Sequence, residues 1–248
     1  MRNLLILLIT TMLGCTSSIN APTTTWKKTG YTEADGIVEI ATAWGLSHLC
    51  TGSLLSETVV LTAAHCVDYP AEDLYIVYGC NDIKSVDCNR VTIKKTIKYP
   101  AWRKEFVFAD DIAIIITDKP IQDIGISKIS SREKLEEGLS VRAFGFGERN
   151  GSSGVLYVGL GRVTRDYERE LVIFMPGKLD PNPGDSGGPI LILNNDEWEI
   201  VGILSRARWE TVKKKEVFEQ TGYAIYTKPV YYIDWINETI YKEECTVN

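Results

Sequence analysis

Histidine is scarce in this sequence, and its scarcity limits both metal binding and acid–base chemistry. Only His48 and His65 occur among the 248 residues, and none of the six cysteines belongs to a CxxC pair. Structural zinc sites usually combine closely spaced cysteine and histidine ligands. We therefore expect no metal and no other cofactor, and a histidine acting as a base has to be one of these two.

The sequence also has no excess of positive charge. It contains 27 Lys and Arg against 33 Asp and Glu, which gives a net charge of -6 and a pI near 5.1. Proteins that bind nucleic acid need a basic face for the phosphates. We expect a peptide or protein substrate and no nucleic acid partner, and we expect the protein to be a monomer.

The hydrophobic run at the N-terminus is too short to span a bilayer. Leu4–Leu13 follows Arg2, a pattern typical of a signal-peptide core, although a buried helix is an alternative. Met12 to Cys15, "MLGC", partly resembles a bacterial lipobox, in which Cys15 carries the lipid. Residues 16–35 would then be a flexible tether. The prediction is an exported protein, extracellular or periplasmic, that is either anchored through Cys15 or secreted in soluble form.

Cysteine is absent from the long segment Asn89–Glu244. In an exported chain the remaining cysteines suggest disulfides, although sequence alone cannot fix their connectivity. The simplest interpretation pairs cysteines that are near in sequence and leaves Cys245 unpaired; a bridge from Cys245 to Cys80 or Cys88 is the alternative. The two expected disulfides are Cys50–Cys66 and Cys80–Cys88.

Short runs rich in Val, Ile and Tyr recur on both sides of the polar connection Ser130–Gly138, for which one short helical turn is expected. Evenly spaced short strands are typical of an all-β sandwich or barrel. The expected strands are Ile37–Ala43, Leu49–Leu55, Val59–Thr62, Leu74–Tyr78, Val91–Lys98, Ile112–Thr117, Leu139–Phe146, Leu156–Val163, Glu170–Phe174, Ile190–Leu193, Trp198–Leu204 and Tyr223–Thr227.

The chain ends with a segment of helical character. Pro229 suits the first turn of a helix. Apolar residues follow near helical spacing, and they are Val230, Ile233, Ile236 and Ile240. We expect a C-terminal helix over residues 229–248.

Ser186 lies in the glycine- and proline-rich stretch "PNPGDSGGP", Pro181 to Pro189. These are ordinary turn residues, so the serine could be no more than a hydroxyl in a tight turn. A serine becomes a useful nucleophile only when a base removes its proton and hydrogen-bond donors receive the oxyanion. The rest of the chain must therefore supply those groups.

Two further motifs offer a base and an acid. His65 stands in "TAAHC", after a strand-like run and before Cys66, although a histidine at the edge of a core is the alternative. Asp111 stands in "DDIAII" at the start of an apolar strand, where a carboxylate needs a partner. Asp110 is interpreted as a solvated loop residue, and His48 as structural.

The three motifs "TAAHC", "DDIAII" and "GDSGGP" occur in the order His, Asp, Ser, and with them the sequence resembles the trypsin/chymotrypsin family of serine peptidases. Further similar segments are "HLCTGSLLSETVVLTAAHC", "AFGFG", "IVGILS" and "YAIYTKPVYYIDWI". The resemblance implies two six-stranded antiparallel β-barrels with a C-terminal helix. The implied boundaries are 36–128 for the first barrel, 129–228 for the second and 229–248 for the helix.

The resemblance also implies a role for each matching residue. His65 is the general base, Asp111 orients it and Ser186 is the nucleophile of a serine endopeptidase, with the N–H groups of Gly184 and Ser186 as the oxyanion hole. Ser205 lies opposite the substrate backbone. A catalytically silent trypsin-fold binding protein, or an active peptidase with non-tryptic specificity, is the alternative.

Specificity depends on the loop before the serine. The resemblance places Asp180 at the floor of the specificity pocket, which favours cleavage after Arg or Lys; a turn aspartate before Pro181 is the alternative. Ala207 and Ala224 stand where trypsins carry glycines and would narrow the pocket. Arg206 replaces a tryptophan and could pair with Asp180.

Asp185 raises the question of activation. In the family its counterpart pairs with a new N-terminus, usually beginning Ile-Val-Gly-Gly, that cleavage releases. Here "GIVEI", Gly36–Ile40, is better interpreted as the first barrel strand, so we expect an internal partner and no activating cleavage. Arg142, in "SVRAFGFG", is the expected partner.

Overall fold

The computed structural model describes residues 35–42, 48–103, 110–149, 151, 153–175, 181–214 and 217–245. Within these ranges, the side chains of residues 48, 49, 208–214, 217–222, 244 and 245 are not described. None of the helices in this part of the chain is long and apolar enough to cross a membrane.

The first six strands form a closed antiparallel barrel in the order β1-β2-β3-β6-β5-β4. Closure is direct, because β1 pairs with β2 along one edge and with β4 along the other. Val, Ile and Leu side chains fill the barrel, and β1, β3 and β6 are buried along their whole length. The strands are β1 (Ile37–Thr42), β2 (His48–Ser56), β3 (Val59–Thr62), β4 (Leu74–Tyr78), β5 (Asn89–Lys98) and β6 (Ala113–Thr117).

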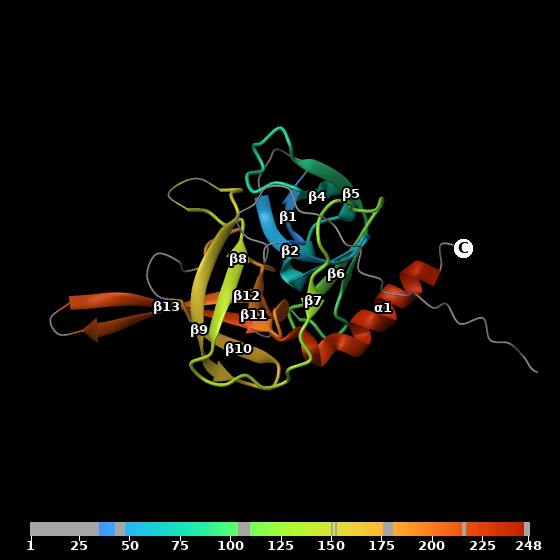
Figure 1. Ribbon diagram of the computed structural model, residues 1–248. Coiled ribbons are helices and arrows are strands. Elements are labelled where there is room, and N and C mark those ends of the chain that lie inside the picture. Colours follow the sequence, from blue (N-terminus) through green and yellow to red (C-terminus); the bar gives the residue numbers. More distant parts are fainter. Residues whose placement is uncertain are drawn as a thin grey trace, which may run out of the picture.

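The second barrel has six antiparallel strands in the order β11-β8-β9-β10-β13-β12, and pairing of β11 with β12 closes it. A short strand β7 (Lys128–Ile129) adds parallel to β12. The expected fold, two six-stranded antiparallel barrels with a C-terminal helix, is therefore confirmed (Figure 1). The strands are β8 (Ser140–Gly145), β9 (Tyr157–Asp166), β10 (Glu170–Met175), β11 (Pro189–Asn194), β12 (Glu197–Lys214) and β13 (Val217–Thr227).

Two details of the second half differ from the sequence-based prediction. β12 continues to Lys214 and β13 begins at Val217, so the pair extends as a two-stranded ribbon that projects from the body of the protein in Figure 1. Its charged and polar sequence lacks the hydrophobic alternation by which strands are recognised. The connection Ser130–Gly138 contains no helical turn; it ends in a hydrogen-bonded turn instead, with Leu139 N–H donating to the Glu136 carbonyl.

The C-terminal segment returns from the second barrel to the first. A 3₁₀ turn, Pro229–Tyr232, leads into helix α1 (Ile233–Cys245). Tyr232 and Ile236 join the core of the first barrel, and Tyr99 packs edge-on against Tyr232 at 4.9 Å between ring centroids. Ile233 is exposed, so the predicted apolar stripe is wrong at that residue.

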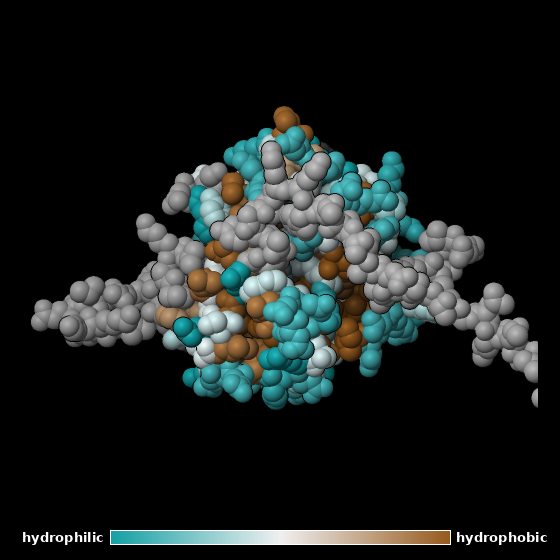
Figure 2. Space-filling view, in the orientation of Figure 1, coloured by the Kyte–Doolittle hydropathy of each residue, from teal (hydrophilic) through white to brown (hydrophobic). Residues whose placement is uncertain are grey.

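A separate buried cluster joins the two barrels. Ile37 and Ala41 of β1 pack with Phe144 and Leu191 of the second barrel. Burial of apolar surface stabilises such an interface by roughly 25 cal/mol per Å². In Figure 2, hydrophobic residues gather near the middle of the face, between largely hydrophilic upper and lower ends. The cluster fixes the barrels relative to each other, which the site between them requires.

Candidate active site

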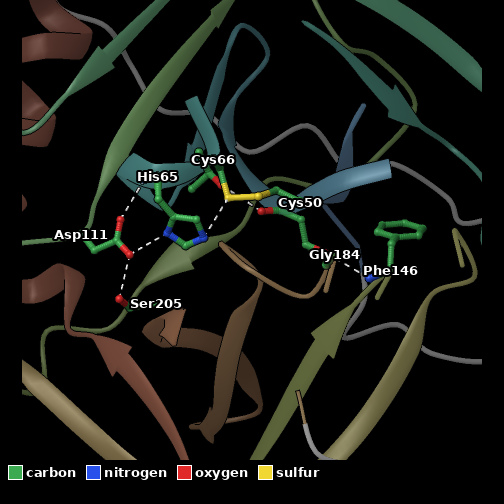
Figure 3. Close-up of a disulfide and its surroundings, with 9 residues drawn as sticks. Cys50, His65, Cys66, Asp111, Phe146, Gly184 and Ser205 are labelled. Atoms are coloured by element: carbon green, nitrogen blue, oxygen red, sulfur yellow. Dashed lines mark hydrogen bonds and ion pairs between the residues drawn. A yellow bond between two sulfur atoms is a disulfide. The ribbon is translucent and has the colours of Figure 1, made fainter. Parts of the chain in front are cut away.

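His65 is held at the end of the first barrel by a disulfide. β3 ends at Thr62, and a 3₁₀ turn, Ala64–Val67, carries the histidine. Cys66, the next residue, is bonded to Cys50 of β2, as expected from the sequence (Figure 3). The second expected disulfide, Cys80–Cys88, is also present, whereas the side chain of Cys245 lies outside the described residues. The first disulfide restrains the backbone from which the imidazole projects.

Asp111 has a fully buried carboxylate just before β6, and three donors converge on it. Its Oδ2 lies 2.7 Å from His65 Nδ1 and accepts a hydrogen bond from Ser205 Oγ at 2.7 Å. Its Oδ1 accepts the backbone N–H of His65 at 3.0 Å. A carboxylate accepts up to four such bonds, so this arrangement satisfies the desolvated charge (Figure 3).

The Asp111 contact fixes the tautomer of the imidazole. A carboxylate only accepts hydrogen bonds, so Nδ1 of His65 carries the proton and Nε2 keeps its lone pair. The sulfur of Cys66 lies 3.9 Å from Nε2, but a disulfide sulfur has no proton to donate. The His65 side chain is 21% exposed. With Nδ1 protonated, Nε2 can accept a proton from a donor that approaches the exposed part of the ring.

Asp110 is not the solvated loop residue that the sequence suggested. Its Oδ1 accepts hydrogen bonds from Arg169 Nη1 at 2.8 Å and from the Tyr232 hydroxyl at 2.7 Å. Its backbone is left-handed, with φ of 57°, a conformation that aspartate tolerates better than most residues. The expectation was wrong because both partners are distant in sequence. Asp110 ties the Asp111 loop to the second barrel.

Ser186 lies in a tight turn docked against both barrels. The Ser186 carbonyl accepts the N–H of Thr51 at 2.8 Å, and the N–H of Gly187 donates to the Leu204 carbonyl at 2.8 Å. Thr51 follows Cys50, and Leu204 precedes Ser205. The turn is thus anchored beside Cys50, whose disulfide restrains His65, and beside Ser205, whose hydroxyl binds Asp111.

Glycines make this close docking possible. Gly184 and Gly187 have φ of 99° and 78°, which glycine adopts without strain. A Cβ at Gly187 would overlap Thr62 Oγ1 and the Thr51 carbonyl. The Thr51 hydroxyl donates to the Gly184 carbonyl at 2.8 Å and accepts the Phe146 N–H at 3.0 Å. Nothing in the sequence indicated this role for Thr51, because a buried threonine in a strand is ordinary.

A surface cleft opens beside the serine. Ala207 lines it and pairs with Ala224 across β12 and β13, and Ala224 is fully buried. Arg206 forms a two-pronged ion pair with Glu170, at 2.8 and 3.1 Å. Asp180 lies outside the described residues. The described lining consists of Pro181, Asn182, Pro183, Ser186, Leu204, Arg206 and Ala207.

The partner of Asp185 is Arg149, and the prediction of Arg142 was wrong. Arg149 Nη2 lies 2.6 Å from Asp185 Oδ2. Arg142 is on β8, and its guanidinium instead lies over the ring of Trp198 at 4.5 Å from the centroid. Sequence proximity to the matching strand favoured Arg142, but the cation that reaches Asp185 follows β8, in the segment beside the serine turn.

Cys50, His65 and Cys66 bring possible metal-ligand atoms within 4.8 Å of one another. Metal binding by cysteine requires a free thiolate, and both sulfurs here are joined in the disulfide. The group is therefore better explained as the support of His65 than as a metal site.

The geometry is that of a buried carboxylate, an oriented imidazole and a serine in a glycine-rich turn between two β-barrels. A comparison with known families matches residues 29–236 to the family model described as Trypsin. The match covers most of the chain, including both barrels. The protein belongs to the trypsin/chymotrypsin-like family of serine peptidases.

Proposed function

We propose that the protein is a serine endopeptidase in which Ser186, His65 and Asp111 form the catalytic triad. The observation that carries the proposal is the Asp111 carboxylate, which is fully buried and accepts bonds from His65 and Ser205. A buried carboxylate that receives the Nδ1 proton keeps Nε2 available as a base and stabilises the imidazolium that forms. A purely structural histidine has no need of this arrangement.

In the proposed reaction, Ser186 Oγ attacks the carbonyl carbon of the scissile peptide bond while His65 Nε2 takes its proton. The N–H groups of Gly184 and Ser186 receive the oxyanion. His65 then protonates the leaving amine, which leaves an acyl-enzyme. Water, deprotonated by the same imidazole, attacks the acyl group and releases the acid.

We propose cleavage after Arg or Lys, with Asp180 as the carboxylate that pairs with the substrate cation. The ion pair between Arg206 and Glu170 supports this proposal, because it supplies Arg206 with a counter-ion other than Asp180. The Ala207–Ala224 pair favours a narrower pocket than glycines would leave, and with it a preference for unbranched side chains. A non-tryptic preference is the alternative outcome of the substrate test.

Covalent labelling tests the catalytic proposal. A fluorophosphonate should label the wild-type chain at Ser186, and the Ser186→Ala and His65→Ala variants should take no label. The control variant is Ser85→Ala, because Ser85 is exposed. Thr62→Ser would be a poor control, because Thr62 packs against the serine turn. A wild-type chain that folds but takes no label would support the silent binding protein instead.

A peptide library tests the specificity. We expect kcat/KM for Arg and Lys to exceed that for Leu and Phe by at least about 10², and the ratio to collapse in Asp180→Ser. The charge-matched control is Asp196→Ser, at the turn between β11 and β12. If Asp180→Ser leaves the preference unchanged, Asp180 is only a turn residue.

We also propose export, with Cys15 as a lipid anchor. The support is in the sequence: an apolar N-terminal run followed by "MLGC", and disulfides that suit an oxidising compartment. Cys15→Ser should move the protein from the membrane fraction to the soluble fraction. Unchanged fractionation would favour secretion without a lipid.

A further inference from the structure

The Asp185 carboxylate is enclosed by hydrogen-bond donors. Its Oδ1 accepts the N–H of Gly147 at 2.8 Å, and its Oδ2 accepts the N–H of Asn182 at 2.8 Å and Arg149 Nη2 at 2.6 Å. The Asp185 side chain is only 7% exposed. A Cβ at Gly145 or Gly147 would overlap this carboxylate. The surroundings are therefore shaped around a carboxylate in this one position.

Asp185 lies between Gly184 and Ser186, whose N–H groups are the proposed oxyanion hole. The Asp185 N–H donates to the Asn182 carbonyl at 3.0 Å, and its carbonyl accepts the Gly188 N–H at 2.9 Å. The side chain and both backbone groups of Asp185 are thus bonded at once. The Ser186 N–H shares a peptide plane with the Asp185 carbonyl, whereas the Gly184 N–H shares a plane with the Pro183 carbonyl, which accepts the Glu148 N–H at 3.0 Å. While these bonds hold, neither plane can rotate, and the two N–H groups keep their direction.

Arg149 belongs to a segment that runs alongside the serine turn. Between the Gly147 and Arg149 bonds to the carboxylate, the Glu148 N–H donates to the Pro183 carbonyl at 3.0 Å. Of these contacts, only the Arg149 guanidinium brings a full positive charge to the buried carboxylate. A buried carboxylate without a cation is strongly destabilising and would favour a rearranged turn.

The Arg149 side chain is itself held in place. Its Nη1 donates to the Glu148 carbonyl at 2.8 Å, its guanidinium carbon lies 5.6 Å from the centroid of the Tyr157 ring, and the side chain is 15% exposed. The guanidinium is planar and rigid, so little freedom is lost when it binds the carboxylate. The pair is thus well prepared by its surroundings.

We propose that Arg149 is the positioning residue of the oxyanion hole, and that it makes the chain active on folding, without cleavage to release a new N-terminus. This inference rests on the proposed peptidase function. The cation that Asp185 needs comes from an internal side chain, which is present as soon as the second barrel folds.

The N-terminal part of the first barrel agrees with this proposal. Ile37 and Val38, the residues that most resemble a released terminus, are buried within β1 and pair with Ser53 and Gly52 of β2. The Gly36 carbonyl accepts the Leu54 N–H at 2.7 Å. A cut before Ile37 would create a new N-terminus at a residue that is already paired and buried in the barrel.

The first test compares Arg149→Ala and Arg149→Gln with Arg142→Ala, a control that removes an arginine of the same barrel. We expect kcat of both Arg149 variants to fall by about 10²–10³ with a smaller change in KM, the loss typical of a disabled oxyanion hole. Arg149→Lys should retain the charge and lose about tenfold. Near-UV circular dichroism should show that the variants remain folded.

Chemical rescue separates positioning from general stability. Guanidinium ion at non-denaturing, millimolar concentration should restore part of the kcat of Arg149→Ala, and sodium chloride at equal ionic strength should not. The wild-type chain and Arg142→Ala should not respond. Equal activity of Arg149→Ala and Arg142→Ala would overturn the positioning role while leaving the proposed function intact.

The second test asks which form of the chain is active. The full-length protein, expressed with its export signal, is labelled with a fluorophosphonate and its intact mass is measured. We expect label on chains whose N-terminus lies upstream of Lys27, and no gain in labelling after limited proteolysis near Lys27–Lys28. Label confined to chains that begin at or after Lys28 would overturn activation by folding. A folded wild type without any label would overturn both the proposed function and this inference.

Discussion

The two barrels contribute to one site but are held by different interactions. The first barrel carries His65 and Asp111 and has both disulfides of the described chain. The second barrel carries Ser186 and has no cysteine between Asn89 and Glu244. Instead it uses partly or fully buried ion pairs, which are Arg149–Asp185, Arg206–Glu170 and Lys228–Asp166.

The base and the nucleophile are therefore held by different interactions: a disulfide beside His65, and an ion pair beside Ser186. A disulfide restrains the unfolded chain and does not depend on pH or salt. A buried ion pair stabilises only when both partners are in place, and loss of one partner leaves an uncompensated charge. The halves are not independent, because Ser205 of the second barrel binds Asp111 of the first. We therefore expect single substitutions to lower the stability of the second barrel, which holds the nucleophile, more than that of the first.

The largest expected effect is on Asp111. In Asp111→Asn one oxygen becomes an amide donor, which cannot accept the bonds that His65 and Ser205 now donate to it. We expect kcat to fall by about 10⁴ with the fold retained. The neighbouring Asp110→Asn is the control, because it removes the negative charge that faces Arg169 but does not touch the imidazole in the described hydrogen bonds. Comparable kcat values for the two variants would contradict the assignment.

Lys228 tests whether an ion pair takes the place of a disulfide in the second barrel. Its side chain is 1% exposed, its Nζ lies 2.6 Å from Asp166 Oδ1, and it also donates to the Glu133 carbonyl. Lys228→Met should lower the free energy of unfolding by about 3–5 kcal/mol, because Asp166 is left buried without its cation. Urea unfolding measures this. Lys242→Met breaks an exposed pair and should cost less than about 0.5 kcal/mol; equal losses would refute the comparison.

The two disulfides of the first barrel should differ in their effect on activity. Replacing Cys50 and Cys66 together by Ala should cost about 3 kcal/mol of stability and reduce activity, since both are buried and Cys66 adjoins His65. The Cys80–Cys88 bridge closes a shorter and more exposed loop, so its removal should cost about 2 kcal/mol and leave kcat unchanged. Guanidinium unfolding and a peptide assay on both double variants decide this. A loss of kcat in the Cys80/Cys88 variant but not in the Cys50/Cys66 variant would contradict the role given to the Cys50–Cys66 disulfide.

Glu39, in the first barrel, should make the free energy of unfolding depend on pH. It lies on the same face of β1 as Ile37 and Ala41, and burial raises the pKa of its carboxyl to about 8 despite the charge of Arg90, with a smaller contribution from Asp82. The unfolded chain loses this proton near pH 4.5, so between these values the folded state binds more protons. Stability should therefore fall as pH rises through this window and level off above pH 8.

Glu39→Gln tests this dependence directly. Between pH 6 and pH 9 the wild type should lose about 2–3 kcal/mol from this group, and the variant should lack that part of the slope. Urea unfolding at several pH values measures both curves. Parallel curves for the variant and the wild type would show that Glu39 does not titrate in this range.

Much of the fold was predictable from the sequence because it depends on local patterns. All twelve expected strands are present, since short runs rich in Val, Ile and Leu, either continuous or alternating with polar residues, are typical of strands. Both expected disulfides join cysteines that are close in sequence. By contrast, β7 and the ribbon beyond Ala207 have no hydrophobic alternation, and the pairing of their backbones does not depend on it.

The sequence by itself determined which residues are chemically able to form the site: a serine between glycines, a single well-placed histidine and an aspartate at the start of a buried strand. Only the tertiary structure decided which groups hold them. Thr51 and Ser205 bind Gly184 and Asp111 from strands of different barrels. Arg149 rather than Arg142 reaches Asp185, because the segment after β8 runs beside the serine turn, whereas the Arg142 guanidinium lies over the ring of Trp198. Such contacts arise when the barrels close and pack together. Nearness along the sequence does not predict which residues then meet.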